Sequence, residues 1–227
     1  MCGRFSISVT KAELLEYIQS EYEISEIGDD ILLPRYNVAP SQKILSIIND
    51  GKKNRIGLIK WGLVPSFAKD ASIGNRMINA KSETIVEKPS FTPSLKNKRC
   101  VILADGFYEW DRQGKTKTPM RFVLGGQKLF PMAGLWSTFV KPDGSKLFTC
   151  AIITTHANGI VSPFHDRMPV ILDSKSQSLW LNPAITDPLV LQSLLLPYDE
   201  SRMRMYEVSR TVNNANSDTV ECIHPVG

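Results

Sequence analysis

Residues 120–132 read MRFVLGGQKLFPM, with two short apolar runs on either side of a glycine pair. The first run is 120–124, the second is 128–132, and Gly125 and Gly126 lie between them. Two glycines in this position are typical of the tight turn that joins neighbouring antiparallel strands, because glycine tolerates positive φ angles. We therefore predict a β-hairpin here.

Similar short runs occur along most of the chain and are the main guide to its fold. A turn is predicted at Asp50-Gly51, directly before one of these runs. Besides the two runs within 120–132, the strand-like segments are 2–8, 44–48, 55–61, 100–104, 147–154 and 204–208. They predict an α+β fold, in which residues 1–227 form a single β-rich domain. We expect mixed and antiparallel sheets that curl into a barrel-like core, with helices at the periphery.

Helix signals are few and lie near the two ends of the chain. Thr10 and Glu13 form a Thr-x-x-Glu capping box, which predicts a helix that ends near Glu23. A short helix is expected at 175–181, and another begins at Asp187, where an N-cap residue is followed by proline.

The composition is that of an ordinary globular protein. Of the 227 residues, 42% are hydrophobic and 22% are charged, and the net charge of +4 is compatible with a polyanionic partner without demonstrating one. The 4 cysteines are widely spaced and form no metal-ligand pattern, so we expect no metal and no disulfide. No apolar run reaches the roughly 18 residues of a membrane span. These features favour a soluble protein of the cytoplasm, associated with the nucleoid when bound to DNA. We expect a monomer that needs no cofactor.

Cys2 is the most informative cysteine because it directly follows Met1. Removal of Met1 would leave Cys2 with a free α-amine beside its thiol, and this 1,2-aminothiol is available only from an N-terminal cysteine. Both groups have reference pKa values of about 8 to 8.5, so modest perturbation makes them reactive near neutrality. With an aldehyde, the amine forms an imine and the sulfur closes a thiazolidine ring. The simpler alternative is a buried cysteine without a chemical role.

Three further residues are candidates for catalysis. Asn79 lies in a polar stretch and offers both a donor and an acceptor, although an asparagine there also suits a turn. Glu109 stands between aromatic residues, where desolvation would raise its pKa towards the range useful for proton transfer; a surface position on the strand is the alternative. His165 is followed by Asp166 and Arg167, an arrangement that suits a tuned imidazole beside an anion-binding guanidinium.

Short motifs in a fixed order give the chain a specific resemblance. They are Met-Cys-Gly-Arg-Phe at the start, Arg35-Tyr36-Asn37-Val38-Ala39-Pro40, Trp61-Gly62-Leu63-Val64-Pro65, Ile78-Asn79-Ala80, Gly106-Phe107-Tyr108-Glu109-Trp110 and His165-Asp166-Arg167-Met168-Pro169. Each motif is weak alone, but the ordered set resembles the SRAP family, the SOS response-associated peptidases. The resemblance runs from Cys2 to about Val212.

This resemblance implies chemistry on abasic sites in single-stranded DNA during the DNA damage response. Cys2 would join the ring-opened sugar aldehyde through a thiazolidine, which makes a protective DNA-protein crosslink. Asn79 would hold the terminal amine, Glu109 would transfer protons, and His165 would assist opening of the sugar or reversal of the link. The residues implied in binding DNA are Arg4, Pro40, Trp61, Phe67, Lys81, Thr154 and Arg167.

The sequence departs from the family pattern at two positions. Lys81 stands where the family commonly has arginine, so the charge is kept and the bidentate fork is lost. After Trp61, the family often has neighbouring aromatic residues that wedge against bases; here Phe67 keeps one such surface and Ala68 does not. DNA affinity or lesion geometry is therefore expected to differ from the family norm.

Two other functions remain open from the residues alone. The Cys2 thiol with its own amine as base also fits an N-terminal-nucleophile amidohydrolase, a reading that includes autoproteolytic removal of Met1. A reader of modified bases in DNA would bind without needing Cys2. The crosslinking function is favoured over both.

Overall fold

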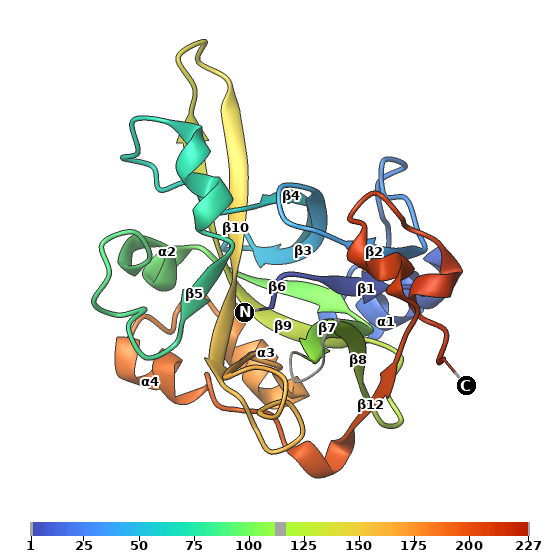
Figure 1. Cartoon of the computed structure of the whole chain (residues 1–227). Coiled ribbons are helices and arrows are strands. Elements are labelled where there is room, and N and C mark those ends of the chain that lie inside the picture. Colours follow the sequence, from blue (N-terminus) through green and yellow to red (C-terminus); the bar gives the residue numbers. More distant parts are fainter. Residues whose placement is uncertain (1, 112–116, 227) are drawn as a thin grey trace.

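Five strands form a closed β-barrel at the centre of the computed structural model, which describes residues 2–111 and 117–226 (Figure 1). Neighbouring strands pair in the order β10-β4-β3-β6-β9, and β9 pairs with β10 again, so the ring closes. Only the β10–β4 pair among these is parallel. The strands are β3 (Lys43–Asn49), β4 (Asn54–Trp61), β6 (Arg99–Ala104), β9 (Phe130–Val140) and β10 (Lys146–His156). This arrangement confirms the predicted barrel-like core.

Two short strands extend the barrel sheet at β10. The first, β5 (Asn79–Lys81), runs parallel to β10, and the second, β11 (Arg167–Pro169), runs antiparallel to it. Through these pairings, the Asn79 and Arg167 segments meet along one strand although they are distant in sequence.

A second, antiparallel sheet packs beside the barrel in the order β12-β8-β7-β1-β2. Its strands are β1 (Phe5–Ile7), β2 (Arg35–Val38), β7 (Gly106–Asp111), β8 (Thr118–Leu124) and β12 (Met203–Glu207). Asp105 separates β6 of the barrel from β7 of this sheet. Its carboxylate accepts hydrogen bonds from Ser6 Oγ at 2.6 Å and from Arg121 Nη2 at 2.9 Å, which fixes the crossing point between the sheets.

Gly106, at the start of β7, allows this buried ion pair to form. A Cβ at position 106 would lie 2.6 Å from Arg121 Nε, so only glycine leaves room for the guanidinium. Although burial opposes its charge, Asp105 holds the pKa of Arg121 above the usual arginine value. The result is a rigid base for β7, the strand that carries Glu109.

Helices lie outside the sheets, as predicted. They are α1 (Lys11–Tyr22), α2 (Thr92–Asn97), α3 (Ser174–Leu181) and α4 (Pro188–Ser193), with short 3-10 turns η1 (Ala71–Arg76), η2 (Glu200–Arg202), η3 (Arg210–Asn213) and η4 (Val220–Cys222). The capping box at Thr10 and Glu13 is present, and Glu23 ends the first helix with φ of 60°. Asp187 caps α4 by accepting from the Leu189 backbone N–H.

The hairpin predicted at Gly125-Gly126 is wrong, whereas the turn predicted at Asp50-Gly51 is confirmed and joins the paired strands β3 and β4. Strand β8 pairs with β7 and β12, and β9 pairs with β6 and β10, so the strands on either side of the glycine pair belong to different sheets. Gly126 has φ of 77°, as a tight turn requires. The turn therefore forms, but it directs the chain from one sheet into the other.

Candidate functional site around Cys2

Cys2 is fully buried in the main hydrophobic core, just before β1. Figure 1 shows the start of the chain in the middle of the molecule, near β5 and β10. The Asn79 side chain on β5 donates from Nδ2 to the Cys2 carbonyl oxygen at 3.0 Å. Residue 2 is therefore held by a specific hydrogen bond, as a positioned nucleophile would require.

Burial and charge both act on the Cys2 thiol. Desolvation is the larger cause and the nearby Glu109 carboxylate the second, and together they raise the pKa of the thiol to about 12. The Glu109 charge thus acts directly on Cys2. The side chains of Cys2, Asn79 and Glu109 form one cluster between the barrel and the second sheet.

The raised pKa predicts slow alkylation of Cys2 in the folded chain. A pKa of about 12 instead of 9.0 leaves roughly a thousandfold less thiolate at neutral pH, and the thiolate is the reactive form. We expect the native chain to react with iodoacetamide far more slowly than the urea-unfolded chain. The rate should rise about tenfold per pH unit, because the pKa lies above the working range. Peptide mass spectrometry of the time course measures this; fast modification of Cys2 at pH 7 in the native chain would contradict it.

Glu109 lies on β7 with only 3% of its surface exposed, which excludes the surface position left open by the sequence. In the antiparallel β1–β7 pair, Phe5 lies opposite Phe107. The residues before Phe5 therefore run alongside the residues after Phe107, which brings Cys2 close to Glu109. A carboxylate buried next to a nucleophile is well placed for proton transfer.

Asn79 and Thr154 each keep a buried polar atom with no hydrogen-bond partner in the described structure, Asn79 Oδ1 and Thr154 Oγ1. They lie on paired strands, because Asn79 is opposite Ile152 on β10 and Thr154 follows two residues later. Buried polar atoms rarely remain unpaired in native proteins, and such exceptions are frequent at functional sites. Asn79 Oδ1 and Thr154 Oγ1 are two such exceptions on neighbouring strands.

His165 lies in the loop before β11 and is held within that loop. Its Nδ1 accepts a hydrogen bond from the Arg167 backbone N–H at 2.9 Å, and Asp166 Oδ1 lies 2.7 Å from the same nitrogen. The preceding Phe164 ring packs on Phe122 of β8 at 5.6 Å, which fixes the loop over the second sheet. The loop itself therefore orients the imidazole ring through Nδ1.

Arg167 is buried and forms a two-pronged ion pair with Glu83. Its Nη1 and Nη2 donate to the Glu83 carboxylate at 2.9 and 2.8 Å, and Nη2 also donates to the Thr154 carbonyl oxygen at 2.5 Å. Burial opposes ionisation of Glu83, but the Arg167 hydrogen bonds outweigh it and lower the pKa of the carboxyl. His156 Nε2 lies 3.3 Å from the same carboxylate. Sequence reasoning missed Glu83, although it lies in the polar stretch that contains Asn79, and it left His156 without a role.

The other residues expected to bind DNA differ in accessibility. Trp61 is fully buried and donates from Nε1 to the Ile78 carbonyl oxygen at 2.8 Å, so it positions the segment next to Asn79. Arg4 Nη1 donates to Asn37 Oδ1 at 2.7 Å. Pro40 is half-buried, whereas Lys81 is exposed. Phe67 has 62% of its surface exposed and is available for stacking.

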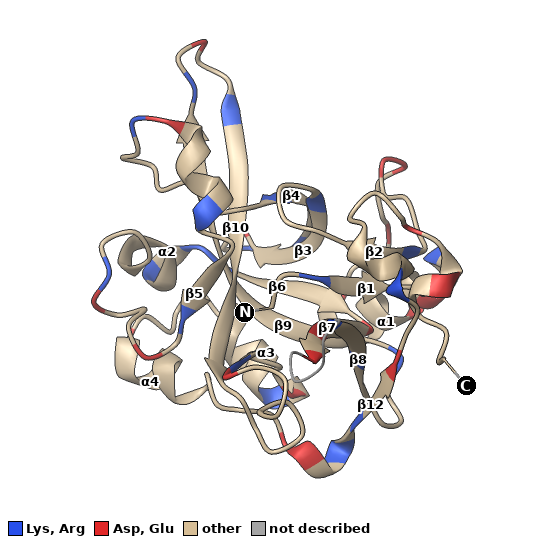
Figure 2. Ribbon diagram, in the orientation of Figure 1, with Lys and Arg blue, Asp and Glu red and all other residues tan. Residues whose placement is uncertain are grey.

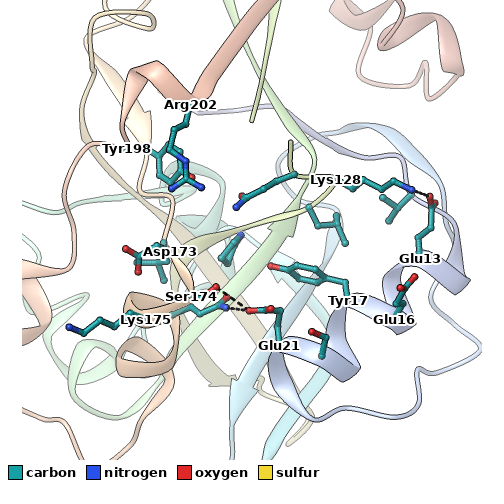
Figure 3. Close-up of a pocket in the computed structure, with 17 residues that line it drawn as sticks. Glu13, Glu16, Tyr17, Glu21, Lys128, Asp173, Ser174, Lys175, Tyr198 and Arg202 are labelled. Atoms are coloured by element: carbon teal, nitrogen blue, oxygen red, sulfur yellow. Dashed lines mark hydrogen bonds and ion pairs between the residues drawn. The ribbon is translucent and has the colours of Figure 1, made fainter. Parts of the chain in front are cut away.

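A pocket of about 750 Å³ lies elsewhere, between α1 and α3, and no residue of the Cys2 cluster lines it (Figure 3). Its polar side chains bind one another: Glu21 accepts from Gln177 at 2.7 Å, and Lys128 donates to Glu13 at 2.6 Å. This pocket is therefore separate from the candidate site.

Within residues 2–111 and 117–226, every helix is too short or too polar to span a membrane. No group of three or more histidine, cysteine, aspartate or glutamate side chains in these ranges is arranged to hold a metal ion.

Comparisons with known proteins cover almost the entire chain. Residues 1–215 match the family described as SOS response associated peptidase (SRAP). The abasic site processing protein YoqW of Bacillus subtilis (strain 168) is 50% identical over 224 residues, covering 98% of this chain and 99% of that protein. The abasic site processing protein HMCES of Rattus norvegicus is 32% identical over 270 residues, covering 99% of this chain and 76% of that protein. A crystal structure of a protein from Bacteroides thetaiotaomicron superimposes with a TM-score of 0.88 at 25% identity, covering 99% of this chain and 100% of that one.

Proposed function

Because this chain belongs to the SOS response associated peptidase (SRAP) family, we propose that it processes abasic sites in single-stranded DNA by joining them to Cys2. The names of its relatives support abasic sites as the substrate. The observation that carries the proposed chemistry is the cluster in which Asn79 holds Cys2 beside the Glu109 carboxylate.

The proposed reaction is a condensation without oxidation or reduction. After Met1 is removed, the α-amine of Cys2 attacks the aldehyde carbon of the open sugar, and loss of one water gives an imine. The thiol then adds across the C=N bond, with sulfur bonding to carbon and the proton passing to nitrogen. The product is a thiazolidine that links residue 2 to the DNA.

Each residue of the cluster has a proposed role in these steps. Glu109 accepts a proton from the attacking amine and returns it to the departing oxygen, the usual work of a buried general acid-base. Asn79 keeps residue 2 in place, and its unpaired Oδ1 accepts from the amine. Nε2 of His165 assists opening of the sugar, and the unpaired hydroxyl of Thr154 binds near the ring.

Ring closure also protects the strand. An imine alone favours elimination of the 3′ phosphate, which cleaves DNA. A sulfur already positioned beside the imine consumes it first.

Lys81 and Arg167 differ in what they offer a phosphate. Lys81 is exposed and carries a free charge, whereas Arg167 is buried and already neutralised by Glu83. Lys81 therefore makes the direct phosphate contact in this proposal. Arg167 shapes the site wall by holding Glu83 and the Thr154 carbonyl oxygen together.

A crosslinking assay with the full chain tests the function. The protein is incubated with a single-stranded oligonucleotide carrying one abasic site, after intact mass has confirmed the loss of Met1. We expect a band that survives denaturation, with the summed mass less one water. The control oligonucleotide carries a tetrahydrofuran analogue without an aldehyde and should give no adduct. Absence of the adduct with the true abasic site would overturn the proposal.

A further inference from the structure

The outer ends of β9 and β10 form a hairpin that projects beyond the barrel (Figure 1). Its register places Phe148 opposite Thr138 and Lys146 opposite Val140. In a β-hairpin, directly paired residues lie on the same face, and so do residues two positions apart on one strand. The register therefore determines which side chains share one face of this hairpin. This hairpin patch consists of Lys98, Trp136, Thr138, Val140, Lys146 and Phe148.

The hairpin patch exposes apolar and aromatic surface. Val140 is 58% exposed and Phe148 is 47% exposed. The Trp136 and Phe148 rings lie 6.3 Å apart, and Lys98 Nζ lies 5.0 Å above the Trp136 ring. Lys98 Nζ is also 3.5 Å from Thr138 Oγ1, so the cation is fixed against the aromatic pair. A planar, apolar group can stack here next to a positive charge.

The charge around the hairpin patch is mainly positive. Lys146 is exposed at the start of β10, Lys141 is exposed directly after the end of β9, and Asp143 lies in the turn between the two strands. Figure 2 shows a basic segment on each side of the hairpin and an acidic segment at its tip. Hydrogen bonds from Ser145 lower the pKa of Asp143 and hold its carboxylate within the turn. The patch face itself therefore suits an anionic partner.

Strand β10 connects the hairpin patch to the Cys2 site. Phe148 and Thr154 lie on the same strand, and six residues at about 3.3 Å each separate them by roughly 20 Å. Ile152, between them, pairs with Asn79. A stacked nucleic-acid strand has one phosphate per about 3.4 Å, so about six nucleotides cover the distance.

Resting on the proposed function, we propose that the hairpin patch is a second contact for the same DNA strand, outside the lesion pocket. An unpaired base stacks on Phe148 beside Trp136, and neighbouring phosphates bind Lys146 and Lys98. Stacking on an exposed aromatic ring requires an unpaired base, which assigns the patch to single-stranded DNA. The hairpin patch thus sets how much strand next to the lesion the protein needs for tight binding.

Substitution Phe148→Ala tests the stacking contact. Binding is measured with two oligonucleotides that carry the unreactive tetrahydrofuran analogue, one with about two and one with about twelve nucleotides on each side of it, lengths chosen around the six-nucleotide span. We expect Phe148→Ala to weaken binding of the long strand about tenfold and to leave the short strand unchanged. The matched control is Leu32→Ala, which removes a 74% exposed side chain on another surface and should change neither.

Substitution Lys146→Gln tests the phosphate contact. In a salt titration with the long strand, each lysine–phosphate contact contributes about 0.7 to the slope of log affinity against log salt. We expect the slope to fall by about that amount in Lys146→Gln. The control is Lys11→Gln, which removes the same charge from an exposed position on α1. This variant should keep the salt slope of the unmodified chain.

The outcomes separate this proposal from the proposed function. Crosslink yield at saturating DNA should be equal in Phe148→Ala and the unmodified chain. If the unmodified chain forms no crosslink, the proposed function fails, while binding of undamaged strands of the same lengths still measures the patch. Equal affinity of Phe148→Ala for the long strand would overturn the patch proposal. Altered self-association in sedimentation with unchanged DNA affinity would assign the patch to a protein contact and also overturn it.

Discussion

Replacing Cys2 by serine is expected to abolish the stable adduct with abasic DNA. The serine variant keeps the α-amine, so an imine still forms, but a hydroxyl does not close a thiazolidine. The imine then persists and favours β-elimination. We therefore expect loss of the crosslinked band and appearance of cleaved strand, both measured on a denaturing gel, with intact mass to identify any residual adduct.

Cys222→Ser is the matched control for this substitution. Cys222 is also fully buried, but it lies in a separate small core with Tyr108 and Val212. The control should crosslink as the unmodified chain does. A denaturation-resistant adduct of unchanged yield in Cys2→Ser would exclude the thiol from the reaction and refute the mechanism.

Replacing Glu109 by glutamine is expected to slow crosslinking by about 10²- to 10⁴-fold, the usual contribution of a general acid-base. Glutamine has nearly the same shape but transfers no proton. The charge of Glu109 also raises the pKa of the Cys2 thiol, so its loss should lower that pKa. Alkylation of Cys2 at neutral pH should therefore become faster in this variant while crosslinking becomes slower.

The opposite changes in alkylation rate and crosslinking rate distinguish a loss of catalysis from misfolding. A locally disordered site would increase alkylation of every buried cysteine, whereas loss of the Glu109 charge acts on Cys2 alone. Single-turnover crosslinking and peptide-resolved alkylation measure the two effects on one sample. Glu207→Gln, on the exposed edge of β12, serves as the control. Equal crosslinking rates in Glu109→Gln and the unmodified chain would remove Glu109 from the proton-transfer step.

The sequence predicted local elements of the fold more reliably than their partners. The capping box of α1 and the β3–β4 turn were predicted correctly, because neighbouring residues alone determine them. The Gly125-Gly126 turn was also located correctly, but the pairing of its flanking strands was wrong. Leu124 pairs with Met203, a residue that no local pattern identifies. Strand partners depend on how the barrel closes, which is a property of the whole chain.

In the candidate site, too, local features were predictable from the sequence, whereas contacts between distant residues were not. Periodicity left open which face of β7 is buried, and only the packing of the second sheet on the barrel places Glu109 inside. The structure joins Asn79 and Glu109 to Cys2, which family motifs anticipated as a set. Glu83 was missed because its importance comes from Arg167, a residue 84 positions away in the sequence. Spatial ion pairs of this kind leave no local signal.

The burial of residue 2 has a consequence for protein synthesis. Cys2 is synthesised 77 positions before its hydrogen-bond partner Asn79. Glu109 and the strands that cover Cys2 follow later still. In the proposed function, loss of Met1 exposes the α-amine of Cys2. Removal by an aminopeptidase would be easiest before these strands cover residue 2, whereas removal by the chain itself would require the folded site. Whether Met1 is lost before or after folding would therefore tell the two routes apart.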